Sequence, residues 1–221
     1  NTALGYWALR QNVTGSFNTA LGYQAAQAMD HKFNVIAVGN KAAYANTGND
    51  VIATGSDAAY SNSGLGVIAI GAAAARNNTG DDVIAAGSSA GRWNAAKNVV
   101  AIGHYAGANN AVTGFDLIAI GTQAGRRNTG RGLIAIGNTA GFRNTGADVI
   151  ATGSGAAYRN TGDNVIAIGT SALDIVTSGS GNIAIGQNAG HALATGSNNI
   201  YLGVNVQGTG VESGVVRIGT G

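Results

Sequence analysis

A glycine recurs at a nearly constant interval along the whole sequence and closes a short apolar run each time. These marker glycines stand at positions 5, 22, 39, 55, 71, 87, 103, 121, 137, 153, 169, 186, 203 and 219, with spacings of 16 to 18 residues. A period this short is typical of a solenoid, in which one unit cannot bury its own apolar face and stacks on its neighbours. The sequence therefore predicts a β-solenoid of the parallel β-roll type with about 14 coils.

The residues before each marker glycine predict a short strand. Most copies resemble Val67–Ile70, which reads Val-Ile-Ala-Ile. Isoleucines occupy one alternating face, as at Ile68, and valine and alanine occupy the other, as at Val67 and Ala69. A strand that is apolar on both faces is typical of a parallel sheet covered on both sides.

The residues after the marker glycine predict a short helical return limb. Counted from that glycine, position +3 is alanine in the first twelve copies, +4 is nearly always alanine or glycine, and +7 is asparagine in nine. Positions +2, +5 and +6 vary freely. Restriction at 3, 4 and 7 is helical spacing, whereas a strand would bury the arginine at +5, as in Arg76. We expect one or two helical turns that cover the isoleucine face of the sheet.

A coil of about sixteen residues has room for one strand and one return limb, which leaves the Val/Ala face uncovered. That apolar stripe is longer than monomers tolerate, so it predicts self-association. Small side chains and closed cyclic symmetry favour an elongated homotrimer, with a dimer as the alternative. The predicted trimer interface comprises Val35, Val51, Val67, Val83, Ala119, Leu133, Ala135, Val149 and Val165.

Aromatic and arginine side chains gather at positions +5 and +6 and predict an outward-facing column. Aromatic faces and guanidinium groups are typical of surfaces that bind carbohydrate or protein receptors. The alternative is that these long side chains only shield the return limb. The candidate receptor-contact surface comprises Tyr44, Tyr60, Arg76, Arg92, Trp93, Arg126, Arg127, Phe142, Arg143, Tyr158 and Arg159.

Two further columns of polar residues are predicted at the turns. The asparagines at +7 should stack and satisfy the turn backbone and each other, with ligand binding as the alternative. Before the strand, an aspartate appears in every second copy, as at Asp116 and Asp148, with a neutral residue such as Gly132 between. Because strands stack about 4.8 Å apart, this alternation keeps like charges apart.

The sequence offers little for catalysis or for metal and cofactor binding. His31, His104 and His191 lie in distant copies at different repeat positions, which argues against a metal site. Glu212 is the only glutamate, and the aspartates form a regular column instead of a converging pair. A net charge of +2 gives no reason to expect nucleic acid or membrane insertion. We expect no enzyme activity and no cofactor.

The repeat changes near the end of the sequence, where polar residues open the strands and Tyr201 and Arg217 replace the strand alanine. We expect regular repeats over 1–181 and a divergent segment, a cap or a transition to a following module, over 182–221. The chain begins inside a repeat, as a fragment or processed piece would.

Two families share these motifs. The segments Asn1–Leu9 and Asn18–Ala25, together with Asn198–Gly203 and Val215–Gly219, resemble bacteriophage tail fibres that end in a self-cleaving intramolecular chaperone. The Val-Ile-Ala-Ile-Gly strands are also similar to head repeats of trimeric autotransporter adhesins, although those repeats are typically shorter and lack the alanine-rich limb. Either resemblance implies an extracellular homotrimer, in a virion tail fibre or on a bacterial surface.

These resemblances imply a structural part of a fibre or adhesin that contacts a host-surface glycan or protein receptor. A depolymerase is a more distant alternative. Ice binding through a threonine column is disfavoured, because the column is interrupted at Ser63, Ala95 and Ala111.

Overall fold

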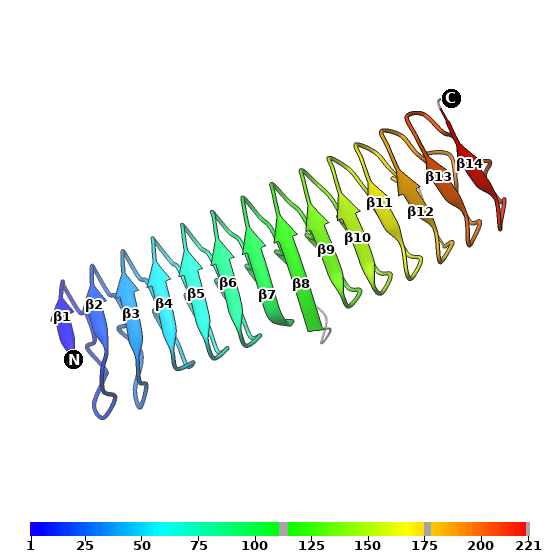
Figure 1. Cartoon of the computed structure of the whole chain (residues 1–221). Coiled ribbons are helices and arrows are strands. Elements are labelled where there is room, and N and C mark those ends of the chain that lie inside the picture. The colour runs from blue at the N-terminus through cyan, green and yellow to red at the C-terminus, as the bar shows by residue number, and fades with distance from the viewer. Residues whose placement is uncertain (111–114, 175–177, 220–221) are drawn as a thin grey trace. The chain divides into compact units, whose positions relative to one another are not determined.

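The computed structural model describes residues 1–110, 115–174 and 178–219, and its contacts divide the chain into two units, Asn1–Thr113 and Gly114–Gly221. Each unit is a stack of parallel β-coils (Figure 1). The first unit contains β1 (Thr2–Leu4), β2 (Thr19–Leu21), β3 (Val35–Val38), β4 (Val51–Thr54), β5 (Val67–Ile70), β6 (Val83–Ala86) and β7 (Lys97–Ile102). The second contains β8 (Phe115–Ile120), β9 (Leu133–Ile136), β10 (Val149–Thr152), β11 (Ile166–Ile168), β12 (Ile183–Ile185), β13 (Ile200–Leu202) and β14 (Val216–Ile218). The prediction of a parallel β-solenoid is confirmed.

Neighbouring strands pair in parallel, and each residue faces its counterpart in the next coil. In β3 and β4, for example, Val35 pairs with Val51 and Ala37 with Ala53. The same register relates β9 to β10 in the second unit. Equivalent side chains therefore form columns that run along each unit.

The two faces of the sheet are the reverse of those predicted. Val35 and Ala37 are fully buried inside the coil, whereas Ile36 is 42% exposed. A Cβ added at Gly91, at position +4, would meet the Cβ of Ala85 at 3.1 Å, so the return limb lies on the Val/Ala face. The interior between the limbs is narrow: where Leu117 or Leu133 stands in place of valine, the +4 residue is glycine, and a Cβ added at Gly125 or Gly141 would meet that leucine at 3.1 Å. Most coils are therefore filled by valine and alanine, and the isoleucines point outward.

This reversal removes the predicted trimer interface from the surface. Its members are at most 1% exposed and are buried within their own coils, so the assignment of these residues to an interface is wrong. The residues concerned are Val35, Val51, Val67, Val83, Ala119, Leu133, Ala135, Val149 and Val165.

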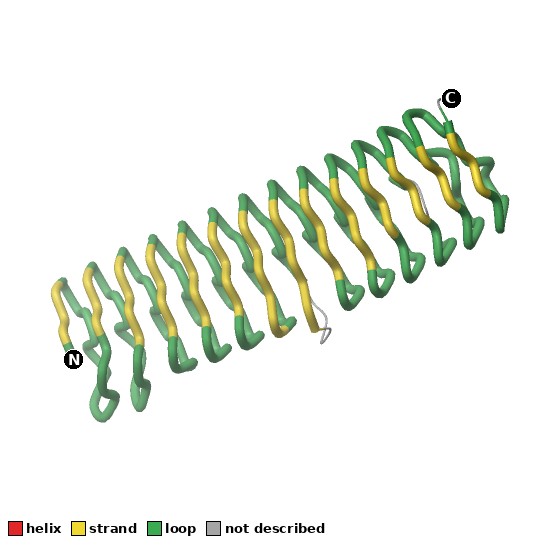
Figure 2. Tube along the Cα trace, in the orientation of Figure 1, coloured by secondary structure: helices red, strands yellow, loops and turns green. Residues whose placement is uncertain are grey.

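The return limb is not helical: no helix occurs among the described residues (Figure 2). Instead, every second residue has a positive φ, as at Lys41 (52°), Ala43 (50°) and Ala45 (53°). The N–H of Lys41 donates to the carbonyl of Tyr23 in the preceding coil at 2.9 Å, and that of Ala43 donates to Ala58 in the following coil at 2.8 Å. Because the backbone alternates in handedness, these N–H groups donate to carbonyls of the neighbouring coils. In a helix they would donate to carbonyls of the same helix.

The side chains predicted to be buried in the return limb are buried nevertheless. Ala42, Ala43 and Asn46, at +3, +4 and +7, are all fully buried. The helical interpretation was wrong because alternating backbone handedness buries the same positions. Non-glycine residues are uncommon at positive φ, so the alanines there are held by their hydrogen bonds to neighbouring coils.

The predicted asparagine column is confirmed as a structural ladder. Asn78 donates its side-chain N–H to Oδ1 of Asn62 at 2.8 Å and to the carbonyl of Gly80 at 2.7 Å. Asn160 bonds Asn144 in the same way, at 2.8 Å. These four amides are fully buried and bonded within the protein, which supports a structural role over ligand binding.

Backbone conformation explains the residue types found five positions before each marker glycine. From β3 onward this position holds only asparagine, aspartate or glycine, with φ between 54° and 69°. These residue types tolerate the left-handed region best. Asn34 donates to Oδ1 of Asp50 at 2.8 Å, so the column also forms contacts between coils. The positive φ accounts for the residue types in this column, and the separation of like charges by alternate coils stays a prediction.

The C-terminal coils keep the fold but change its interior. Tyr201 replaces the strand alanine and is fully buried, and Leu193 occupies the +7 position of its coil. Asn182 and Asn199 place the buried amide on the strand side, where Asn199 donates to Oδ1 of Asn182 at 3.1 Å. The change expected at 182 therefore falls inside the second unit, whereas the contacts divide the chain at 113/114.

The same substitution at two glycines should have opposite effects. Gly137, a marker glycine at φ 132°, has the carbonyl oxygen of Gly153 only 2.6 Å from an added Cβ, so Gly137→Asn should cost more than about 3 kcal/mol. A Cβ added at Gly132, at φ 63°, would meet Oδ1 of Asp148 at 2.6 Å, but that atom ends a side chain that can rotate to the position Asp50 takes beside Asn34, so Gly132→Asn should be neutral or stabilise by up to about 1 kcal/mol. Thermal unfolding compares them, and similar losses at both positions would contradict the backbone account.

Candidate functional site

The predicted outward column at +5 and +6 lies on the surface in both units. These positions follow the buried +4 residue and precede the buried asparagine at +7, so the chain presents them outward. Tyr44, Tyr60, Arg76, Arg92 and Trp93 belong to the first unit. Arg126, Arg127, Phe142, Arg143, Tyr158 and Arg159 belong to the second. All are half-buried or exposed, so the structure brings together two separate groups.

In the first unit the column is a stack of rings and guanidinium groups. The rings of Tyr44 and Tyr60 are stacked with centroids 5.1 Å apart, and the guanidinium of Arg76 lies 5.1 Å from the centroid of Tyr60. Arg92 lies 3.7 Å from the ring centroid of Trp93. In-register coils impose this stacking, because they place equivalent rings about one strand spacing apart.

The second unit repeats the arrangement with more charge. Phe142 and Tyr158 are stacked with centroids 5.2 Å apart and an interplanar angle of 6°. Arg143 lies over the ring of Phe142 at 5.6 Å, and Arg159 lies over that of Tyr158 at 5.4 Å. The ring faces thus contact each other and the guanidinium groups, which leaves ring edges and guanidinium N–H groups for a ligand. The sequence indicated which residues face outward but not that their ring faces are occupied.

Each histidine contacts a residue of its own unit. His31 contacts Asp30 at 3.1 Å and His191 contacts Asp174 at 2.5 Å, each in its own part of the chain. The ring of His104 packs edge-on against Tyr105. Within the described ranges, no group of three or more His, Cys, Asp or Glu side chains could hold a metal ion.

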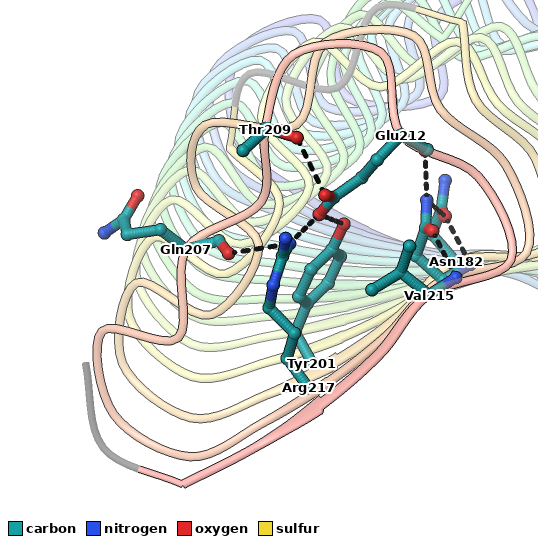
Figure 3. Close-up of polar contacts among 8 residues, drawn as sticks. Asn182, Tyr201, Gln207, Thr209, Glu212, Val215 and Arg217 are labelled. Atoms are coloured by element: carbon teal, nitrogen blue, oxygen red, sulfur yellow. Dashed lines mark hydrogen bonds and ion pairs between the residues drawn. The ribbon is translucent and has the colours of Figure 1, made fainter.

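A polar cluster in the last coils was missed by sequence reasoning (Figure 3). The carboxylate of Glu212 accepts hydrogen bonds from the hydroxyls of Tyr201 at 2.6 Å and Thr209 at 2.7 Å, and it forms an ion pair with Arg217. Arg217 also donates to the carbonyl of Gln207 at 3.3 Å. The signal in the sequence was the replacement of two successive strand alanines by Tyr201 and Arg217, whose partner is a lone glutamate.

The protonation states of this cluster suit a structural role. Burial opposes ionisation of Glu212, but hydrogen bonds from Arg217, Tyr201 and Thr209 outweigh it and lower its pKa to about 2. Burial and the neighbouring carboxylate raise the pKa of Tyr201 above its ordinary value. Neither group exchanges protons readily near neutrality, so the cluster ties the last two strands to the loop that carries Glu212.

Neither a scan of protein-family models nor a comparison with curated protein sequences found a match for the chain. In the part of the chain that the structure describes, no helix is long and apolar enough to span a membrane.

The Glu212 cluster makes the stability of the last coils dependent on pH. Because the pKa of Glu212 falls from 4.5 to about 2 on folding, its contribution is present above pH 4.5 and is lost as pH falls toward 2. Glu212→Gln should flatten the pH dependence of the melting temperature in that window. Gln207→Ala, whose side chain forms none of these bonds, should leave the parent profile intact. Identical profiles for the parent and Glu212→Gln would contradict the assignment.

Proposed function

We propose that this chain is a structural and receptor-binding part of an extracellular trimeric fibre, most closely a bacteriophage tail fibre. The observation that carries the proposal is an apolar sheet face that the chain itself leaves uncovered. Ten of its outward isoleucines are 37–48% exposed. They are Ile36, Ile52, Ile70, Ile84 and Ile102 in the first unit and Ile118, Ile120, Ile136, Ile168 and Ile185 in the second.

Burial of this isoleucine face is of the size needed to offset the cost of association. Fully burying an isoleucine is worth about 1.5–3 kcal/mol, so covering the exposed part of each is worth on the order of 1 kcal/mol. The isoleucines named above therefore offer roughly 10 kcal/mol per chain, comparable with the estimated cost of association of about 4–15 kcal/mol. An apolar stripe formed by the same residue type in most coils favours copies of the same chain as partners.

The resemblance of the repeats to tail-fibre sequences supports the fibre over other assemblies. A bacterial adhesin head is the second candidate, supported by the Val-Ile-Ala-Ile-Gly strands. An adjoining self-cleaving chaperone would favour the fibre, and a membrane-anchoring barrel would favour the adhesin. The outer column of aromatic and arginine residues is the proposed contact for a host-surface glycan or protein. The proposal contains no catalytic step and no cofactor.

The mass in solution tests the assembly. We expect about three times the 21.8 kDa of one chain, by light scattering. Replacing Ile118 and Ile136 together by Asp would place like charges in the shared interface, so the trimer should dissociate. Replacing the exposed Thr129 and Thr145 by Asp, on the return limb, should leave the mass unchanged. A well-folded parent chain that stays monomeric would overturn the assembly and, with it, the fibre.

A further inference from the structure

We propose that Arg127, Arg143 and Arg159 form a strip that binds an acidic polysaccharide, a polymer whose sugars carry carboxylate or sulfate groups. This inference rests on the proposed receptor-binding function and specifies its ligand. The three arginines occupy position +6 in successive coils of the second unit, and all three are exposed. Hydrogen bonds between coils fix the register, as from the N–H of Arg143 to the carbonyl of Arg126 at 2.9 Å.

No carboxylate among the described residues forms an ion pair with this arginine strip. The ion pairs that Arg and Lys form in the described ranges lie elsewhere, at Arg76–Asp57, Lys97–Asp81 and Arg217–Glu212. The acidic residue that follows in the column, Asp174, pairs with His191. The three guanidinium groups therefore face solvent without a carboxylate partner from the described residues.

Binding of a polyanion would relieve the electrostatic repulsion between these arginines. Successive coils are about 4.8 Å apart, which is within the Debye length of about 8 Å at physiological salt, so the arginines repel one another. A guanidinium binds carboxylate, sulfate or phosphate through paired N–H groups. A polymer with repeated acidic groups can contact all three arginines at once, whereas a single small anion contacts one.

The aromatic stack holds two of these arginines in place. The guanidinium groups of Arg143 and Arg159 lie over the rings of Phe142 and Tyr158, at 5.6 and 5.4 Å. This contact orders the side chains before a ligand arrives, which lowers the entropy lost on binding. The N–H edges remain available for the acidic groups of the ligand.

The same stack favours a polysaccharide over a nucleic acid. Single-stranded nucleic acids bind by stacking bases on free aromatic faces, and the faces of Phe142 and Tyr158 contact each other and the arginines. A duplex requires an extended basic surface, whereas this chain has a net charge of only +2. Acidic sugars need only the guanidinium edges.

Biolayer interferometry tests the arginine strip. The immobilised polymers are polygalacturonate and heparin, with neutral dextran as the reference. The parent should bind both acidic polymers, more weakly as salt rises, and should not bind dextran. The triple variant Arg127→Gln, Arg143→Gln and Arg159→Gln should lose at least about tenfold in affinity. The triple variant Lys32→Gln, Lys41→Gln and Arg131→Gln removes the same charge elsewhere and should lose less than about twofold.

Equal losses in the two triple variants would overturn the strip, because net charge alone would then explain binding. No binding of either acidic polymer by the parent, or equally tight binding of single-stranded DNA, would also overturn it. Failure of the arginine strip would not by itself overturn the proposed function. If the parent bound a neutral glycan on an array and kept the trimer mass, receptor binding would be supported and the arginine strip would be rejected as its site.

Discussion

Hydrogen bonding between successive coils, from both the strand and the return limb, is the constraint on which the rest of the structure depends. The strand bonds its neighbours as in any parallel sheet. The return limb does so because its backbone alternates in handedness, so that residues such as Lys41 and Ala43 direct their N–H groups to the preceding and the following coil. Two limbs joined in this way lie close together and enclose a narrow interior.

The width of the interior determines which side chains point outward. Valine, alanine and a buried amide fill the interior in most coils, and isoleucine lies on the outer face of the sheet and arginine and aromatic side chains on the return limb. Because the coils stack in register, equivalent outward residues of successive coils form columns. We propose that other copies of the chain cover the isoleucine column and that an acidic ligand binds the arginine column of the second unit.

Much of this could be predicted from the repeat alone: the parallel strands, the coil length, the buried positions +3, +4 and +7, and the outward positions +5 and +6. The inward face of the strand could not, because Val/Ala and Ile faces are both apolar and only the width of the coil distinguishes them. The return limb was misread because alternating handedness buries the same positions as a helix. The Glu212 cluster depends on a contact across the last coils that no local spacing reveals.

Thiol labelling of single cysteines tests the orientation of the strand most directly, since the chain contains no cysteine of its own. Ala135 and Ile136 are neighbours in β9, and the structure places the first inside the coil and the second outside. In the unassembled chain, the cysteine of Ile136→Cys should react rapidly, and that of Ala135→Cys only when the protein unfolds. Assembly should protect position 136 as well. Rapid labelling at 135 with protection at 136 in the single chain would contradict the account.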